Sequence, residues 1–297
     1  MNLAQALILL RIPFSFFLSP VFFFAFAMSD SPDFLKMAAL FIALHLFIYP
    51  ASNAYNSYMD QDEGSIGGLK NPPKAGILVL WLSILFNAIG FIIVYFMIGR
   101  LAFILLAAYV LASTLYSWKA VRLKQYAILS FLTVMFFQGA CIYSLVFLFG
   151  QVCSYDLALA QVNYKIPAII SSILIAGVYP MTQIYQHKAD AKSGVNTLSM
   201  SLGIKGTFMF CGNAFGIATA LLGYHFFQLQ QSHLFYIFLL FNFPLVAFFL
   251  WWAYKVWDDP NQANFRYTMM LNKTSSIAMV LYFTLVYFIK HTNELPF

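Results

Sequence analysis

Charged side chains are scarce in this sequence of 297 residues. Only 9% of the residues are charged, whereas 62% are hydrophobic and the mean hydropathy is +0.79. Soluble domains carry roughly a quarter of their residues as charges, so this composition excludes an ordinary water-soluble protein. We expect an integral membrane protein that contacts the lipid bilayer and has no nucleic-acid partner.

Cysteine is also rare. The three cysteines, Cys141, Cys153 and Cys211, are odd in number and far apart in the sequence. Such a set favours neither a disulfide framework nor a zinc site.

Long apolar runs are what the sequence does contain. Nine of them are long enough to cross a bilayer as helices. They cover residues 11–28, 35–56, 76–97, 101–118, 127–149, 165–184, 206–226, 232–254 and 274–290. We therefore expect an all-α polytopic protein in which residues 1–297 form a single transmembrane domain, a bundle of nine helices.

Lysine and arginine are distributed unevenly over the loops between these runs. If the N-terminus is cytoplasmic, twelve of the sixteen basic residues lie inside and four outside. Cytoplasmic loops carry such an excess of positive charge. We therefore expect the N-terminus inside, in the cell (inner) membrane. The four outside residues are Lys36, Arg100, Lys165 and Lys290.

A sixteen-residue pattern occurs twice, from Tyr49 to Gly64 and from Tyr179 to Gly194. Seven positions match at a constant offset of 130 residues, in the pattern Tyr-Pro-x2-[Asn/Gln]-x-Tyr-[Asn/Gln]-x3-Asp-x3-Gly. An internal repeat of this kind indicates duplicated structure. Because an even number of spans separates the copies, we expect both at the cytoplasmic surface, in two parallel pseudo-repeats.

The repeated polar residues have helical spacing, so each copy should present two amides and a carboxylate on one helix face. They are Asn53, Asn56 and Asp60 in the first copy and Gln183, Gln186 and Asp190 in the second. Polar residues that begin inside an apolar span are costly and usually functional. Their oxygens suit Mg²⁺, which takes few protein carboxylates and keeps waters or substrate phosphates.

A basic cluster, Lys119, Arg122 and Lys124, lies between the fourth and fifth runs. One interpretation is that it reflects only the positive charge of inside loops. The other is that it binds phosphate groups, Arg through a bidentate fork and Lys as a point charge. Lys205, after the second copy, is a further candidate.

The residues alone leave several functions open. Parallel repeats and helices broken by proline, as at Pro50 and Pro180, also occur in transporters. A transporter site is expected near the midplane, whereas the polar faces here approach one surface and lead into charged loops, as a diphosphate site requires. A protein that binds a lipid diphosphate without turnover is a further alternative.

The repeats and loops resemble the UbiA superfamily of intramembrane prenyltransferases. The family's first motif, Asn-Asp-x2-Asp-x3-Asp, falls on Ser52, Asn53, Asn56 and Asp60. A second register puts the family Asn on Asn56 and Gly64 in the last position. The second motif, Asp-x3-Asp with a following Gly, falls on Gln186, Asp190 and Gly194. The segment 194–203 and the residues Tyr116-Ser117 and Arg122-Leu123-Lys124 are also similar to the family.

This resemblance implies nine transmembrane helices and Mg²⁺ as cofactor. It implies that a prenyl group moves from a prenyl diphosphate to a lipophilic or aromatic acceptor, most readily a quinone precursor, with Asp60 and Asp190 as catalytic residues. Metal and basic side chains would neutralise the departing diphosphate, and aromatic rings would stabilise an allylic cation. Among the aromatic residues the repeat singles out Tyr55 and Tyr185.

The chain also departs from the family motifs. Amides replace acids at Asn53 or Asn56 and at Gln186, and Lys188 stands where the family often has an acid. Three alternatives follow: other acids compensate, Lys188 replaces part of the charge of a second Mg²⁺, or catalysis is impaired. The expected metal ligands are Asp60, Asp62, Glu63 and Asp190. The expected substrate-binding residues are Asn53, Asn56, Tyr55, Lys119, Arg122, Lys124, Gln183, Gln186, Tyr185 and Lys188.

Overall fold

The protein folds as a bundle of long helices. A computed structural model describes residues 1–61 and 64–292. Within these residues nine helical stretches are long and apolar enough to cross a membrane, which confirms the expected all-α fold. They are Leu3–Met28, Phe34–Asp60, Ile77–Met97, Arg100–Ser117, Ala127–Phe149, Val162–Thr182, Leu198–Gln228, Ser232–Asp258 and Phe265–Thr292.

Several of these spans consist of more than one helical segment, where η marks a short 3₁₀ or π segment. In chain order the segments are α1 Leu3–Ile8, α2 Ile12–Ser15, η1 Phe16–Leu18, α3 Ser19–Met28, α4 Phe34–Ile42, η2 Ala43–Ile48, α5 Tyr49–Asp60, α6 Ile77–Met97, α7 Arg100–Ser117, η3 Leu123–Gln125, α8 Ala127–Met135, η4 Phe136–Cys141, α9 Ile142–Phe149, α10 Tyr155–Ala160, α11 Val162–Val178, η5 Pro180–Thr182, α12 His187–Lys192, α13 Leu198–Gln228, α14 Ser232–Asp258, η6 Pro260–Gln262 and α15 Phe265–Thr292.

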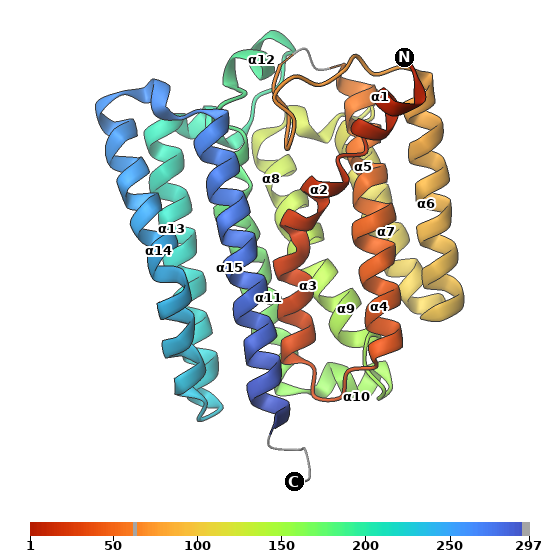
Figure 1. The fold of residues 1–297 in the computed structure, drawn as a ribbon, viewed down its shortest axis with the longest axis vertical. Helices are drawn as coiled ribbons and strands as arrows, with labels where there is room; N and C mark the ends of the chain where they lie inside the picture. Colours follow the sequence, from red (N-terminus) through yellow and green to blue (C-terminus); the bar gives the residue numbers. More distant parts are fainter. Residues whose placement is uncertain (62–63, 293–297) are drawn as a thin grey trace.

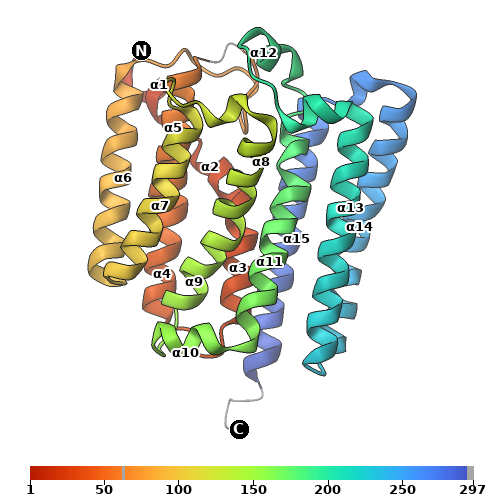
Figure 2. The same cartoon turned by 180° about the vertical axis from the view of Figure 1, so that it is seen from behind.

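The two repeat copies lie at the same end of the bundle. Figures 1 and 2 show the C-terminal end of α5 and the whole of α12 at the end that carries the N-terminus, with α10 at the opposite end. A hydrogen bond joins the second copy to the residue that follows the first, since Gln186 Nε2 donates to the Ser65 carbonyl oxygen at 3.0 Å. The expected parallel arrangement of the two copies is therefore present in the fold.

Close packing in the centre of the bundle depends on aromatic and small residues. Phe24 of α3 stacks on Phe283 of α15 with ring centroids 4.5 Å apart. Gly139 in η4 lies so close to α11 that an added Cβ would be 2.4 Å from Ser172 Cα, so only glycine fits there.

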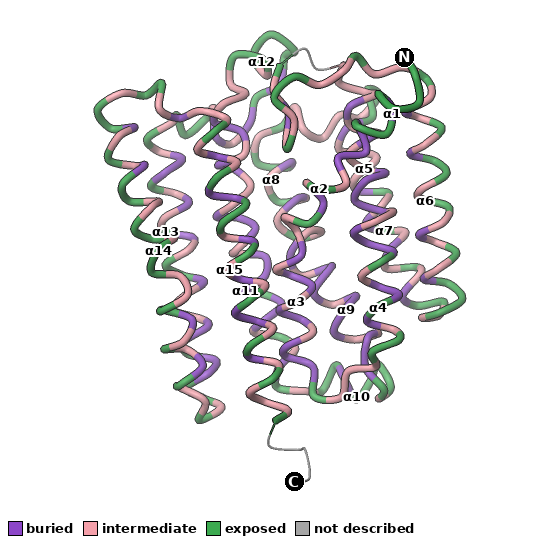
Figure 3. Tube along the Cα trace, in the orientation of Figure 1, coloured by how far each residue is buried: buried purple, intermediate pink, exposed green. Residues whose placement is uncertain are grey.

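The outer surface of the bundle is apolar. Figure 3 shows exposed positions along the outer helices, among them α6 and α14. Phe96, Leu240, Phe243 and Tyr254 are each more than 70% exposed. Contiguous apolar surface of this kind is unfavourable in water, and lipid is the solvent that accommodates it.

The topology makes a direct prediction for the two loops that follow the repeat copies. Reporter fusions at Ser65 and Ser193 should both report the cytoplasmic side, because twelve of the sixteen basic residues then lie inside. A fusion after Ser154, at the other end of the bundle, should report the opposite side. Opposite readings at Ser65 and Ser193 would contradict the parallel arrangement.

Candidate functional site

The first repeat copy forms a regular helix that ends at the polar residues. Pro50, which lacks an N–H, follows the π segment η2 and is placed in the first turn of α5, where a missing donor costs little. Gln61 ends the helix in the left-handed conformation, with φ of 53°. Asn53, Asn56 and Asp60 all line one cavity, as their helical spacing predicts.

The second copy is not a regular helix, and in this respect the sequence-based prediction is wrong. Residues 180–182 form a 3₁₀ turn, residues 183–186 form turns, and α12 begins at His187. Two amides hold this irregular path: Gln183 Oε1 accepts from the Ser199 N–H at 3.4 Å, and Gln186 bonds across to the Ser65 carbonyl. These contacts compensate for helical hydrogen bonds that the break removes. Gln183, Gln186 and Asp190 nevertheless all line the same cavity as the first copy.

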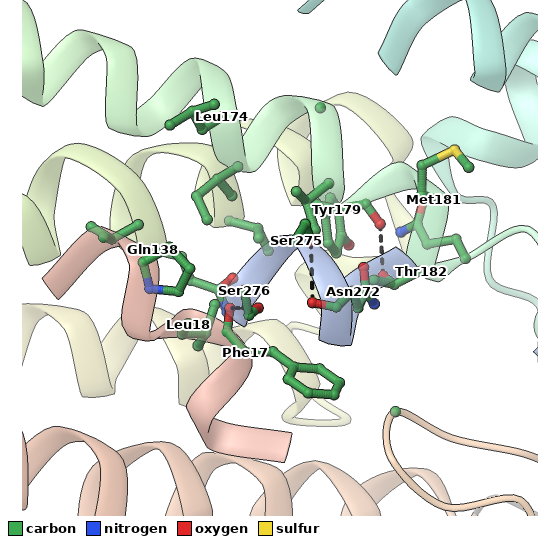
Figure 4. A pocket seen from close by; sticks show the side chains of 18 of the residues that line it. Phe17, Leu18, Gln138, Leu174, Tyr179, Met181, Thr182, Asn272, Ser275 and Ser276 are labelled. Atoms are coloured by element: carbon green, nitrogen blue, oxygen red, sulfur yellow. Dashed lines mark hydrogen bonds between the residues drawn. The ribbon is translucent and has the colours of Figure 1, made fainter. Parts of the chain in front are cut away.

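The shared cavity has a volume of about 660 Å³. Among the described residues that line it, four are charged: Arg11, Asp60, Lys124 and Asp190. Most of the remaining wall is apolar or aromatic, from helices including α3, α7, α11, α13 and α14. Figure 4 shows part of this wall, with Phe17, Leu18 and Leu174 together with polar side chains such as Gln138 and Asn272. One cavity thus joins a charged cluster to a long apolar chamber.

The charged cluster is built around Asp60. Its carboxylate pairs with Lys124 Nζ, and the two side chains are only 7% and 11% exposed. The hydroxyls of Tyr116 and Tyr179 lie 2.6 Å apart. These two tyrosines line the same cavity as Asp60 and Asp190.

Arg11 is a cavity cation whose position the sequence analysis did not anticipate. It is 7% exposed, and its guanidinium donates to the Asn53 carbonyl at 2.9 Å and the Gly67 carbonyl at 3.4 Å. The available signal was an arginine at the start of an apolar run, two residues before Pro13, since charges in spans are rare and usually functional.

Metal-binding capacity in this cluster rests on oxygen atoms. No group of three or more His, Cys, Asp or Glu residues is arranged to hold a metal among the residues that the structure describes. Asp62 and Glu63, the other expected ligands, lie outside the described residues. Asp60 and Asp190 are therefore the described acids from the repeats that could take part.

Several expected substrate-binding residues do line the cavity, and others do not. Lys124 and Tyr185 line it, and Tyr185 also packs edge-to-face on Phe265 at 5.3 Å. The described cavity wall does not include Tyr55, Lys119, Arg122, Lys188 or Lys205.

The basic residues outside the cavity have other environments. Lys119 is exposed, Arg122 donates to the Ser193 carbonyl at 3.3 Å, and Lys205 lies 5.8 Å from the Trp257 ring centroid. The two lysines and Arg122 therefore contribute to the surface around the site, while Lys124 alone of the basic cluster reaches into it.

Lys188 is exposed on α12, two residues before Asp190. Its neighbour His187 adds no positive charge at neutral pH, because partial burial lowers the pKa of that ring. Since Lys188 does not line the cavity, Lys188→Ala and Lys188→Glu should both keep wild-type kinetics and Mg²⁺ dependence. Titration of activity with Mg²⁺ checks this, and a raised Mg²⁺ requirement in Lys188→Glu would show instead that the lysine replaces part of a metal's charge.

A second polar patch lines the cavity on α15. Asn272, Ser275 and Ser276 are spaced as neighbours on one helix face, and all three contribute to the wall. The sequence analysis did not identify them, because Asn272 lies before the apolar run 274–290 and only the two serines fall inside it.

A comparison of the sequence with models of protein families shows to which family the chain belongs. The model of the UbiA prenyltransferase family matches residues 17–277. The chain belongs to the UbiA prenyltransferase family. Family membership, together with the nine apolar helices found in residues 1–61 and 64–292, makes it an integral membrane protein. No curated protein sequence matches the chain.

Solved structures of UbiA homologues have the same fold. A UbiA homologue from Archaeoglobus fulgidus bound to GPP and Mg²⁺ has 17% identity and a TM-score of 0.68, covering 95% of this chain and 99% of the homologue. The apo UbiA homologue from Aeropyrum pernix K1 has 16% identity and a TM-score of 0.70, covering 93% and 98%. A structure of digeranylgeranylglyceryl phosphate synthase has 18% identity and a TM-score of 0.60, covering 96% and 98%.

Proposed function

We propose that this UbiA-family protein transfers a prenyl group from a prenyl diphosphate to a lipophilic or aromatic acceptor, in the first place one of the quinone-precursor type. The reaction would take place at the cytoplasmic side of the membrane. One observation carries the proposal: Asp60 and Asp190, the matched acids of the repeat, line a single cavity whose remaining wall is largely apolar. Homologues of the same fold have been solved with GPP and Mg²⁺ and with DMAPP and Mg²⁺, which supports a prenyl diphosphate as donor.

The oxygen atoms at the charged end fit Mg²⁺. Three amides use their NH₂ groups within the protein: Asn53 donates to Ser15 Oγ at 3.3 Å, Asn56 to Ser117 Oγ at 2.8 Å, and Gln186 to the Ser65 carbonyl. This orientation leaves the amide carbonyl oxygens, together with the carboxylates of Asp60 and Asp190, as ligands for a hard cation. Mg²⁺ prefers such a set, with one or two carboxylates and the rest of its shell from water and substrate phosphate.

The bound Mg²⁺ would supply neutralisation of the diphosphate charge. The chain's own cations add to it: Lys124 and Arg11 line the same cavity and can hold diphosphate oxygens, Lys as a point charge and Arg through its planar fork. Fixed positive groups at the leaving diphosphate stabilise the charge that develops as the bond to the prenyl carbon breaks.

The apolar part of the cavity would hold the prenyl chain and exclude water. Tyr49, Tyr109 and Phe137 contribute aromatic rings to its wall, and Tyr185 contributes one near α12. Aromatic faces stabilise a nearby cation, and a dry chamber protects an allylic cation from hydrolysis. The acceptor would then form the new carbon–carbon bond and lose a proton.

A second candidate function, retention of a lipid diphosphate without turnover, is favoured by the ion pair at Asp60. Lys124 already neutralises this carboxylate, and amides stand where the family has acids, so a bound cation meets less negative charge. Membranes that contain the protein should be incubated with labelled prenyl diphosphates of several lengths and with extracted host lipids, and the products identified by mass spectrometry. A prenylated aromatic product supports the transferase, whereas intact prenyl diphosphate recovered from the protein supports the binding protein.

A further inference from the structure

Asn272 places a largely buried side-chain amide at the cavity wall. It is 5% exposed and lines the cavity. Among the described residues, none forms a hydrogen bond with its side chain. Because the side chain lines the cavity, its amide group can form hydrogen bonds with a molecule bound there. Its amide therefore has both a donor and an acceptor to offer to whatever fills the cavity.

The two serines beside Asn272, unlike the asparagine side chain, donate hydrogen bonds within the protein. Ser275 Oγ donates to the Asn272 carbonyl at 3.1 Å, and Ser276 Oγ donates to the Phe17 carbonyl at 3.1 Å. Their hydroxyl oxygens can still accept, but their protons are used. Asn272 is thus the residue of this patch that can both donate to and accept from a ligand.

The patch lies below the charged end of the cavity. Helix α15 starts at the end that carries the repeats, and Asn272 follows seven residues after its first residue, about 10 Å along the helix axis. A diphosphate at Asp60 and Asp190 would therefore leave Asn272 free for a second molecule deeper in the chamber.

The two cations of the described wall have partners within the protein. Lys124 pairs with Asp60, and Arg11 donates to the carbonyl of Asn53 in the first repeat copy and to that of Gly67 after it. A carboxylate or phosphate placed deep in an apolar chamber without a cation is strongly disfavoured. A neutral hydroxyl or carbonyl is satisfied by one amide.

We propose that Asn272 recognises a neutral hydroxyl or carbonyl group on the acceptor ring, so that the acceptor class is an uncharged phenol or hydroquinone. This inference rests on the proposed function, because it takes the second molecule in the cavity to be the prenyl acceptor. Asn272 is a specificity-determining residue in this assignment, and the serines of the patch line the same ring pocket.

The test is equilibrium binding to purified protein in lipid nanodiscs, with empty nanodiscs as the partition control. The probes are naphthohydroquinone, its dimethyl ether and its ring-carboxylated derivative, each measured with and without Mg²⁺ and geranyl thiolodiphosphate. The wild type should bind the hydroquinone about 3- to 10-fold more tightly than the dimethyl ether, the scale of one neutral hydrogen bond. It should bind the carboxylated probe no more tightly than the hydroquinone.

Asn272→Leu and Asn272→Ala should both abolish the preference for hydroxyl over ether. The alanine variant only enlarges an existing cavity, so the two variants together separate lost recognition from poor folding. The matched control is Asn213→Leu, which changes an exposed span asparagine that bonds its own helix at Met209 and should leave every probe unaffected.

Two outcomes would overturn the assignment: an unchanged preference in both Asn272 variants, or weaker binding of the neutral probes than of the carboxylated one. Binding of geranyl thiolodiphosphate is read separately in each protein and should be the same in the Asn272 variants as in the wild type. If the wild type does not bind this analogue, the proposed transferase function fails, whatever the acceptor probes show.

Discussion

Replacing Asp190 by asparagine should lower the rate of prenyl transfer by about a hundredfold or more, and Asp60→Asn should do the same. Each change removes one negative oxygen donor while keeping the shape of the side chain. Losing one preorganised electrostatic group from a reaction centre typically costs about 10²–10³-fold in rate. Single-turnover formation of prenylated product at saturating Mg²⁺ is the measurement.

The control for this pair is Asp156→Asn. Asp156 is an exposed acid in α10, at the opposite end of the bundle, so its loss should leave turnover within about twofold of the wild type, as for a surface substitution. Full Mg²⁺-dependent activity in Asp190→Asn would remove this residue from the metal site.

Lys124→Met should reduce kcat/KM for the prenyl diphosphate by about a hundredfold, because Lys124 is the member of the basic cluster that lines the cavity. Charge-assisted contacts to a phosphate are about twice as strong as neutral ones, and this one acts where the leaving charge develops. Lys119→Met is the matched control, since Lys119 is exposed and should tolerate the change. Steady-state kinetics with varied prenyl diphosphate compare the two.

Because Lys124 pairs with Asp60, Lys124→Met can lower stability as well as activity. A double substitution separates the effect on stability. Removing one partner of a buried pair leaves the other charge uncompensated, at a cost of about 3–5 kcal/mol in stability. Lys124→Met combined with Asp60→Asn removes both charges and should recover thermal stability without recovering activity. Recovery of activity in the double variant would contradict a direct role for both residues, because Asp60→Asn alone is expected to lower the rate by about a hundredfold.

The sequence was sufficient to predict the membrane-spanning helices, because the bilayer sets a minimum length and hydropathy for each of them. All nine expected runs are helices in the fold. The predicted boundaries were poorest at the N-terminal ends of two later spans, where helix α13 starts at Leu198 and α15 at Phe265, several residues before their apolar runs. Polar residues such as Asn272 continue these helices, and a hydropathy pattern does not register them.

The candidate site was only partly predictable. Asp60 and Asp190, which the identical spacing of the two copies singles out, line one cavity in the structure. Spacing could not reveal that residues 180–186 leave the helix, since that path depends on contacts with Ser65 and Ser199. Arg11 and Asn272 join the cavity from the first and last spans, and tertiary packing alone brings them there.

The most direct test of the central claim follows both halves of the donor in one reaction. Purified protein in nanodiscs is given doubly labelled prenyl diphosphate, an aromatic acceptor and Mg²⁺, and released diphosphate and prenylated product are counted. The account predicts one diphosphate released for each prenylated product, with both lost when a chelator removes Mg²⁺. Donor that stays intact on the protein in the presence of Mg²⁺ and acceptor would contradict it.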